Sequence, residues 1–177
     1  MSNRGSVHGC PLIERIGEGG IADVFRSTWE GREVALKVLR EPDRPAMRKR
    51  FIREGRLLQR LSHPGLVRCL HVFEGLQPVL VLELLKGEPL DDRIARQPLR
   101  GEEAVHLAQA VLRVLQFLHE HGIVHRDVKA SNIYMADDNR VVLMDLGLAI
   151  DPADPLPTTL GDVLGPYAYM APEQLAG

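Results

Sequence analysis

The sequence has little of what marks secreted, disulfide-bonded, membrane-spanning or nucleic-acid-binding chains. Its 177 residues include two cysteines, Cys10 and Cys69, whose wide separation lacks metal-site spacing and indicates reduced thiols in a cytoplasmic protein. The N-terminal residues contain no apolar stretch typical of a signal peptide, and the longest apolar run, 78–85, is far too short to cross a bilayer. A formal net charge of −2 provides no global field toward nucleic acid. We therefore expect a soluble, cytoplasmic chain with no nucleic-acid partner and no membrane segment.

The remaining composition is that of an ordinary globular domain. Hydrophobic residues make up 45% and charged residues 26%, and the length is enough for one domain with a hydrophobic core. Sequence periodicity predicts strands at 12–16, 23–29, 33–39, 66–73, 79–84, 133–135 and 141–144, and helices at 46–61 and 101–121. A linker is expected at 86–89. The order predicts an α+β chain with two lobes, a β-rich one followed by a helical one that carries polar loops.

A glycine cluster at 17–24 is a candidate phosphate-binding loop, because glycine lets backbone N–H groups approach phosphate oxygens closely. A plain hairpin turn is the alternative. A Rossmann fingerprint would need a helix after the glycines, and a P-loop would need a closing Gly-Lys-Ser/Thr; neither is present. Lys37 favours the phosphate hypothesis, since it lies in an apolar strand where an unpaired ammonium would be costly to bury. ATP phosphates would supply its anion, and Glu54 on the following helix would be a second partner.

A second cluster, His125–Asn132, contains the groups that phosphoryl transfer needs. Asp127 can accept the proton of an attacking hydroxyl, and Lys129 can steady the transferred phosphate. Asn132 offers a neutral oxygen of the kind that Mg²⁺ prefers. Asp145, at the end of the predicted strand 141–144, is the second candidate metal ligand.

Five signals occur in the order typical of protein kinases: the glycine cluster, Lys37, the run 125–132, Asp145-Leu146-Gly147 and Ala171-Pro172-Glu173. From about residue 12 to residue 173, the chain resembles the eukaryotic-like (Hanks-type) serine/threonine protein kinases, and their bacterial members in particular. The resemblance implies a protein-kinase-like bilobal fold in a single partial domain, 1–177. It divides into a complete β-rich N-lobe with its αC helix (11–85), a hinge (86–89) and the first part of the helical C-lobe (90–177). ATP and Mg²⁺ are the implied cofactors, and a protein Ser or Thr hydroxyl is the implied acceptor.

The resemblance also implies roles for single residues. Asp127 would be the base, with Lys129, Lys37 and Glu54 as further catalytic residues, and Asn132 and Asp145 would hold the metal. The implied nucleotide-binding positions are Ile16, Gly17, Gly19, Val24, Ala35, Lys37, Leu82, Glu83, Leu85 and Tyr134. Leu82 would be the gatekeeper, and the backbones of Glu83 and Leu85 would bond the adenine edge. Lys129, two residues after Asp127, is the serine/threonine-type choice.

Four positions depart from the family pattern. Ala22 replaces the third glycine, and Leu146 replaces the usual Phe; both changes are tolerated. Tyr134 stands where an aliphatic residue usually forms the adenine floor, so an altered lower face of the pocket is expected. Pro166 replaces a threonine that would bond the catalytic Asp and Lys, and proline has neither a hydroxyl nor an N–H. We expect altered positioning of the peptide substrate, while ATP binding is retained.

Two further expectations concern the end of the chain. Glu173 lies four residues before Gly177, so the remaining helices of the family are expected from a missing C-terminal region or from a partner chain. Thr158 and Thr159 are candidate phosphorylation sites, because a phosphate there would make charge-assisted bonds to Arg126 and to arginines of the helix 46–61.

Three functions compete on this sequence. The first is transfer of the ATP γ-phosphate to a protein Ser or Thr hydroxyl, for which every chemical group is present. The second is a truncated or pseudokinase-like scaffold that binds nucleotide without turnover, favoured by Pro166 and by the expected missing helices. The third, small-molecule phosphotransfer, is disfavoured by Lys129 and by the Ala171-Pro172-Glu173 motif.

Overall fold

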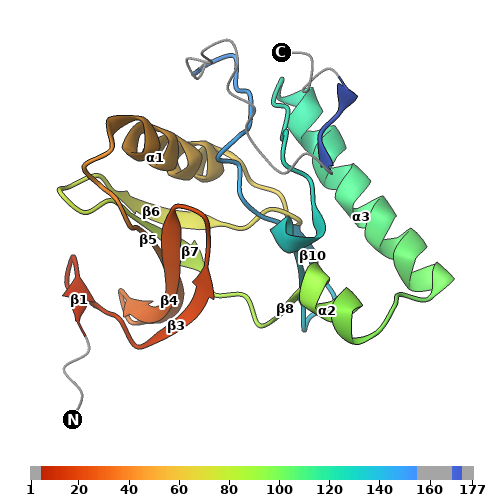
Figure 1. Ribbon diagram of the computed structural model, residues 1–177, viewed down its shortest axis with the longest axis horizontal. Helices are drawn as coiled ribbons and strands as arrows, with labels where there is room; N and C mark the ends of the chain where they lie inside the picture. The colour runs from red at the N-terminus through yellow and green to blue at the C-terminus, as the bar shows by residue number, and fades with distance from the viewer. Residues whose placement is uncertain (1–4, 155–168, 173–177) are drawn as a thin grey trace. The chain divides into compact units, whose positions relative to one another are not determined.

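Alternating apolar residues in the first half of the chain build a five-stranded antiparallel sheet. In the computed structural model, which describes residues 5–154 and 169–172, the strand order is β3-β4-β5-β7-β6 (Figure 1). The bounds are β3 (Glu14–Glu18), β4 (Ala22–Trp29), β5 (Arg32–Leu39), β6 (Cys69–Phe73) and β7 (Val79–Glu83). These five predicted strands are confirmed, with ends that differ by up to three residues. Thr158, Thr159, Pro166 and Glu173 lie outside the described residues.

The hairpin between β4 and β5 follows from its two turn residues. Glu30 and Gly31 both have positive φ angles, 49° and 74°, which is the requirement of a two-residue turn matched to the twist of its strands. Every residue of β4 consequently pairs with one of β5, from Ala22 opposite Leu39 to Trp29 opposite Arg32.

The two faces of β5 are buried by different elements. Val34 and Leu36 pack with Cys10, Val79 and Val81 in one hydrophobic cluster. Cys10 belongs to a small hairpin of β1 (Ser6–Val7) and β2 (Cys10–Pro11), which the sequence pattern did not predict. The alternate residues of β5 face the other way, because side chains on a strand point to opposite faces in turn.

Helix α1 (Pro45–Arg60) lies on that other face, as the predicted helix 46–61 requires. Proline occupies its first turn, where a missing N–H costs nothing. Gly55 allows a close approach to the sheet, since a Cβ built there would lie 2.3 Å from Leu80 Cδ2 and 2.7 Å from Val72 Cγ2. The apolar side of the helix, Phe51, Leu57 and Leu58, is at most 2% exposed.

The second half of the chain forms its own compact unit. One unit contains the chain up to Ser62 together with Val67–Leu85, and the other contains His63–Leu66 and the chain from Lys86 onward. The second unit comprises β8 (Gly87–Pro89), α2 (Leu90–Arg96), α3 (Gly101–Glu120), a short 3-10 helix (Ala130–Asn132), β9 (Ile133–Ala136) and β10 (Val141–Leu143). Helix α3, β9 and β10 confirm the prediction, whereas α2 was not predicted and residues 87–89 of the expected linker form strand β8, which pairs with β9. The predicted α+β order is confirmed.

Local signals explain both ends of α3. At its start, the backbone N–H of Arg100 donates to Glu103 Oε2 at 2.8 Å, as in a capping box. At its end, Gly122 takes a positive φ of 72° and donates its N–H to the carbonyl of His119 at 2.9 Å. None of the helices in the described part of the chain has the length and hydrophobicity that a bilayer crossing requires.

The loop His63–Leu66 packs within the second unit. The backbone N–H of Leu143 donates to the Gly65 carbonyl at 2.8 Å, and Leu66 forms a parallel bridge with Leu143. The His63 ring packs on Phe117 of α3, with ring centroids 4.9 Å apart. Strand β6 therefore begins only at Cys69, because the preceding residues of the predicted strand 66–73 are engaged elsewhere.

Candidate active site

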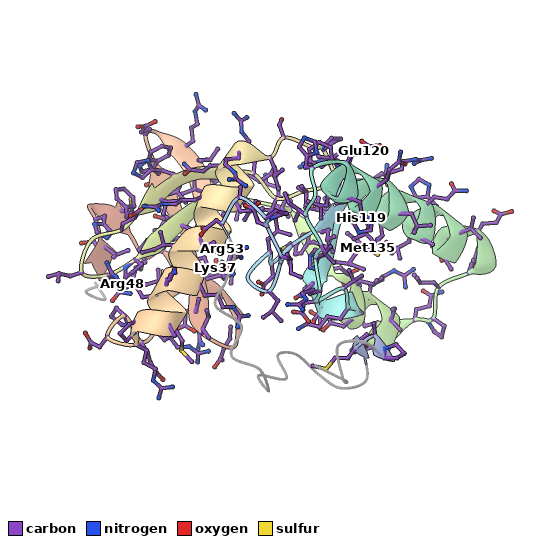
Figure 2. All side chains as sticks on the ribbon, turned by 90° about the horizontal axis from the view of Figure 1, so that it is seen from above. Lys37, Arg48, Arg53, His119, Glu120 and Met135 are labelled. Atoms are coloured by element: carbon purple, nitrogen blue, oxygen red, sulfur yellow. The ribbon has the colours of Figure 1, made fainter. Side chains whose placement is uncertain are left out.

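Lys37 and Glu54 form a doubly bonded ion pair between β5 and α1. The Lys37 Nζ atom donates to Glu54 Oε1 at 2.7 Å and to Oε2 at 2.9 Å. Their side chains are 14% and 3% exposed, so the partnership predicted from the sequence takes place where water screens it weakly. The ammonium also lies 6.0 Å from the centre of the Phe51 ring. Figure 2 shows Lys37 beside the ribbon of α1.

The buried thiol of Cys69 lies close enough to this pair to respond to its charge. Burial, and secondarily the negative charge of Glu54, raise the pKa of Cys69 to about 12. Its Sγ atom donates to the carbonyl of His71 at 3.5 Å. Cys69 is therefore a protonated, unreactive packing residue beside the ion pair.

Four predicted nucleotide-binding residues share one face of the five-stranded sheet. Val24 is the cross-strand partner of Lys37, and Ala35 is the partner of Leu82. Ala35 and Lys37 are two residues apart on β5, so all four side chains lie on the face that α1 partly covers. Gly17 pairs with Val24 and lies at the edge of this group. Ala35 is 7% and Leu82 9% exposed, so the apolar residues beside the Lys37 ammonium are largely shielded from water.

The expected adenine-bonding segment begins where β7 leaves the sheet. Glu83 is fixed from both sides by Arg68, whose carbonyl accepts the Glu83 N–H and whose N–H donates to Glu83 Oε1, each at 2.9 Å. Leu85 follows in an irregular segment, and among the described residues its backbone makes no hydrogen bond. The Leu85 N–H and C=O groups thus have hydrogen-bonding capacity for a ligand.

The glycine loop, residues 17–22, is a tight connection between β3 and β4. The N–H of Gly19 donates to the Ala22 carbonyl at 2.8 Å, which closes the turn. Ile16, just before it, is 46% exposed despite its apolar side chain. Ile16 thus has apolar surface available for contact with a ligand.

The second unit brings two predicted catalytic residues, Asp127 and Lys129, into direct contact with the predicted metal ligand Asn132. Lys129 Nζ donates to both carboxylate oxygens of Asp127, at 3.0 and 2.8 Å. The Asn132 amide donates through Nδ2 to the carboxylate and to the backbone carbonyl of Asp127, both at 2.8 Å. Asp127 is only 8% exposed, so its carboxylate is oriented by charge-assisted bonds with little competition from water.

The backbone of Met144 connects this loop to Asp145. Its N–H donates to the Asn132 carbonyl at 2.8 Å, and its carbonyl accepts from His125 Nε2 at 3.2 Å. The other ring nitrogen of His125, Nδ1, accepts the backbone N–H of Asp127 at 3.2 Å, which requires the neutral ring. Burial lowers the pKa of His125 and keeps it neutral. The sequence did not predict these hydrogen bonds, since each of them involves a backbone group.

Asn132 and Asp145 supply oxygen atoms of the kind that Mg²⁺ prefers. Because Asn132 uses Nδ2 toward Asp127, its side-chain oxygen is the atom left for a cation. Asp145 Oδ1 accepts the N–H of Gly147 at 3.0 Å, which fixes the carboxylate on its own turn. Among residues 5–154 and 169–172, no three His, Cys, Asp or Glu side chains gather as a metal cage. Mg²⁺ generally takes few ligands from the protein and the rest from water and substrate phosphates.

Two residues beside the Asp127 loop hold backbone conformations that few side chains adopt. Arg126 has a φ of 67° and Asp145 a φ of 62°. Strained backbone of this kind persists where the surrounding structure fixes it, and it concentrates at functional sites. Aspartate tolerates the conformation better than most residues, whereas arginine at position 126 gives no signal of it in the sequence.

Tyr134, the expected adenine floor, is held by its hydroxyl. The phenol donates to the Gly87 carbonyl at 2.8 Å, and Tyr134 pairs with Pro89 and Val142 across the β8-β9-β10 sheet. Burial, with the charges of Asp137 and Glu88, raises its pKa. The ring is thus tied to β8 instead of rotating freely.

Comparison with known proteins gives consistent matches. The protein kinase domain family matches residues 11–177. The DNA damage-responsive serine/threonine-protein kinase RqkA of Deinococcus radiodurans is 40% identical over 174 residues, which cover 94% of this chain and 26% of RqkA. Serine/threonine-protein kinase pkn2 of Myxococcus xanthus is 34% identical over 177 residues, covering 94% of this chain and 21% of that protein. Serine/threonine-protein kinase PknA of Mycobacterium tuberculosis is 37% identical over 181 residues, covering 94% and 41%. The chain therefore spans 21% to 41% of the length of these relatives.

Proposed function

Because this chain belongs to the Hanks-type protein kinase family, with relatives among bacterial serine/threonine kinases, we propose that it transfers the γ-phosphate of ATP to a Ser or Thr hydroxyl of a protein. The observation that carries the proposal is the Asp127 carboxylate, buried and oriented by Lys129 and Asn132. A carboxylate held in a fixed orientation is suited to act as a general base toward a hydroxyl placed beside it.

In the proposed reaction, Asp127 accepts the proton of the substrate hydroxyl as its oxygen attacks the γ-phosphorus. The bond between that phosphorus and the β,γ-bridging oxygen breaks, and ADP leaves with the electron pair. Lys129, which already lies against Asp127, steadies the transferred phosphoryl group. Lys37, fixed by Glu54, binds the phosphates that stay with ADP.

The nucleotide would lie on the apolar face formed by Val24, Ala35 and Leu82. Ile16 would cover the adenine, and the backbones of Glu83 and Leu85 would bond the edge of the ring. Gly17 and Gly19 would let the loop approach the phosphates. Asn132 and Asp145 would hold Mg²⁺, which neutralises charge on the phosphates when it is bound.

A protein partner and a cytoplasmic location follow from the same proposal. ATP is a cytoplasmic substrate, and Cys10 and Cys69 are both buried free thiols, as expected in a reducing compartment. Lys129 favours Ser or Thr as the acceptor.

The test is a γ-phosphate transfer assay with Mg-ATP and a generic basic protein. We expect transfer by the unaltered chain, and about a 10²- to 10⁴-fold lower rate for Asp127→Asn, which keeps the shape but not the base. Lys37→Met should weaken ATP binding as well as transfer. Binding of ATP without transfer by the unaltered chain would support the scaffold alternative and overturn the kinase proposal.

A further inference from the structure

One side chain, that of Arg40, braces the glycine loop from outside. Arg40 is the first residue after β5, and its guanidinium donates to the carbonyl of Gly19. A second guanidinium nitrogen lies 3.4 Å from Glu18 Oε1. The backbone N–H of Arg40 donates to the Ile21 carbonyl at 2.9 Å. Both the backbone and the side chain of this residue therefore hold the loop.

Charged neighbours fix the direction of the Arg40 guanidinium. Asp23 Oδ1 lies 3.9 Å from its Nε atom, and Arg15 bridges Asp23 at 2.7 Å and Glu18 at 2.8 Å. Arg40 is 37% and Glu18 62% exposed, and isolated pairs at such exposure add little to folding stability. The effect of this network is local. Its four charged side chains hold the Arg40 guanidinium in place, and the guanidinium in turn restricts rotation of the Gly19 carbonyl.

Holding the Gly19 carbonyl also orients the next amide. The C=O of Gly19 and the N–H of Gly20 belong to one planar trans peptide group and point in opposite directions. The Gly20 N–H therefore faces away from Arg40. Among the described residues it makes no hydrogen bond, and a Cβ built on Gly20 would have no atom within 4 Å. The direction of this amide is thus fixed, and the space beside the Gly20 Cα is open.

We infer that Arg40 is a positioning residue for phosphate binding: it holds the Gly19 carbonyl so that the Gly20 N–H is presented to the phosphates of ATP. The inference rests on the proposed function, since it names a residue that prepares the same nucleotide site. Neither the glycine motif nor the Lys37 strand indicates Arg40, because its contact is made from outside the loop.

The experiment compares ATP with adenosine, which carries no phosphate, as ligands of the full 177-residue chain. Arg40→Met removes the guanidinium and keeps an unbranched apolar side chain. If the prepared loop is then populated about one fifth of the time, the dissociation constant for ATP rises about fivefold. The constant for adenosine should stay unchanged. Arg40→Lys, which has one cation but no fork, should restore part of the ATP affinity.

Arg56→Met is the matched control. Arg56 binds both oxygens of Glu74 at 2.7 Å on the surface of the same unit, away from the glycine loop. It should leave the affinities for ATP and adenosine unchanged. A readout without ligand is hydrogen exchange at residues 19–21, which should be faster in Arg40→Met alone, while thermal unfolding of the two variants is alike.

Each outcome decides the matter. Unchanged ATP affinity in Arg40→Met, or equal weakening of ATP and adenosine, would overturn the inference. An unaltered chain that binds ATP but transfers no phosphate would overturn the kinase proposal and leave the Arg40 comparison decisive by itself. An unaltered chain that binds no ATP would overturn both.

Discussion

Gly87 occupies a backbone position that other residues adopt only with strain. Its φ is 137°, and a Cβ built there would lie 2.1 Å from the Met135 carbonyl oxygen and 2.9 Å from Ala136 Cα. Both obstacles are backbone atoms of β9, so they cannot move aside as a flexible side chain would. The carbonyl of Gly87 itself accepts a hydrogen bond from the Tyr134 hydroxyl, so this glycine also contacts the expected adenine floor.

We predict that Gly87→Ala lowers the free energy of unfolding by about 2–3 kcal/mol, through strained φ and overpacking against β9. Urea denaturation measures the change. Gly101→Ala is the control in the same unit, since a Cβ there meets no atom within 4 Å and alanine favours the helix. Equal destabilisation by both substitutions would contradict the prediction.

The site residues that the sequence could identify are those whose side chain itself carries the functional group that the reaction needs. A lysine in an apolar strand is recognisable because burying its charge without a partner would cost free energy. An aspartate among other polar residues in a loop is recognisable in the same way. The hydrogen bonds of the Met144 backbone to Asn132 and His125 were not predictable, since any residue type supplies the same N–H and C=O groups. The positive φ of Arg126 was not predictable either, because arginine is not a residue type that favours this conformation. The roles of the site residues remain proposals for mutagenesis.

At the scale of elements, Gly55 sets how closely α1 approaches the sheet. Alanine would favour the helix by about 1 kcal/mol in isolation. Here its Cβ would collide with Leu80 and Val72, and Leu80 is fully buried, with 0% exposure. The adjacent residue on the helix is Glu54, so any retreat of α1 also draws that carboxylate away from Lys37.

We predict that Gly55→Ala destabilises the chain by about 1–3 kcal/mol and lowers the rate of phosphate transfer more than it weakens adenosine binding. The adenine face depends on strand residues, whereas the Lys37–Glu54 bond depends on the helix. Gln59→Ala, at an exposed position of α1, should change neither quantity. Unaltered transfer by Gly55→Ala would show that α1 tolerates the displacement.

Long elements were predictable and short ones were not. The strands of the five-stranded sheet and the helices α1 and α3 extend over enough residues for their periods to appear in the sequence. Strands β1, β2 and β8 have two or three residues, too few to establish an alternation. Helix α2 has seven residues and one buried side chain, Leu90, so tertiary packing rather than pattern defines it. The resemblance to the kinase family is confirmed by the match over residues 11–177.

At the scale of the whole molecule, two histidines link stability to pH. Burial lowers the pKa of His63 and of His125. In each case the ring Nδ1 accepts a backbone N–H, that of Gly65 at 3.0 Å for His63, and protonation would remove the acceptor. The unfolded chain therefore binds more protons than the folded chain just below pH 6.5, the ordinary pKa of histidine. Their contribution to stability is present above that pH and is lost as the pH falls below it.

We predict that His63→Asn reduces the loss of stability on acidification from about pH 7.5 to about pH 5.5, across the ordinary histidine pKa. Asparagine keeps an acceptor near the position of Nδ1 but does not titrate in this range. Urea denaturation at the two pH values measures the difference. His106→Asn, an exposed position on α3, is the control and should leave the pH dependence as it is. An identical dependence in His63→Asn and the unaltered chain would exclude His63 as a source.

The loop His63–Leu66 has a consequence for dividing this protein into parts. The chain enters the second unit at His63, returns to the first at Val67 and leaves it again at Lys86. A gene fragment that begins at residue 86 would lack Gly65 and Leu66, so the N–H of Leu143 would lose its acceptor and β10 its parallel neighbour. The helical half is thus not a module that one cut can release, and evolution or engineering that exchanges the two halves has to carry these four residues across as well.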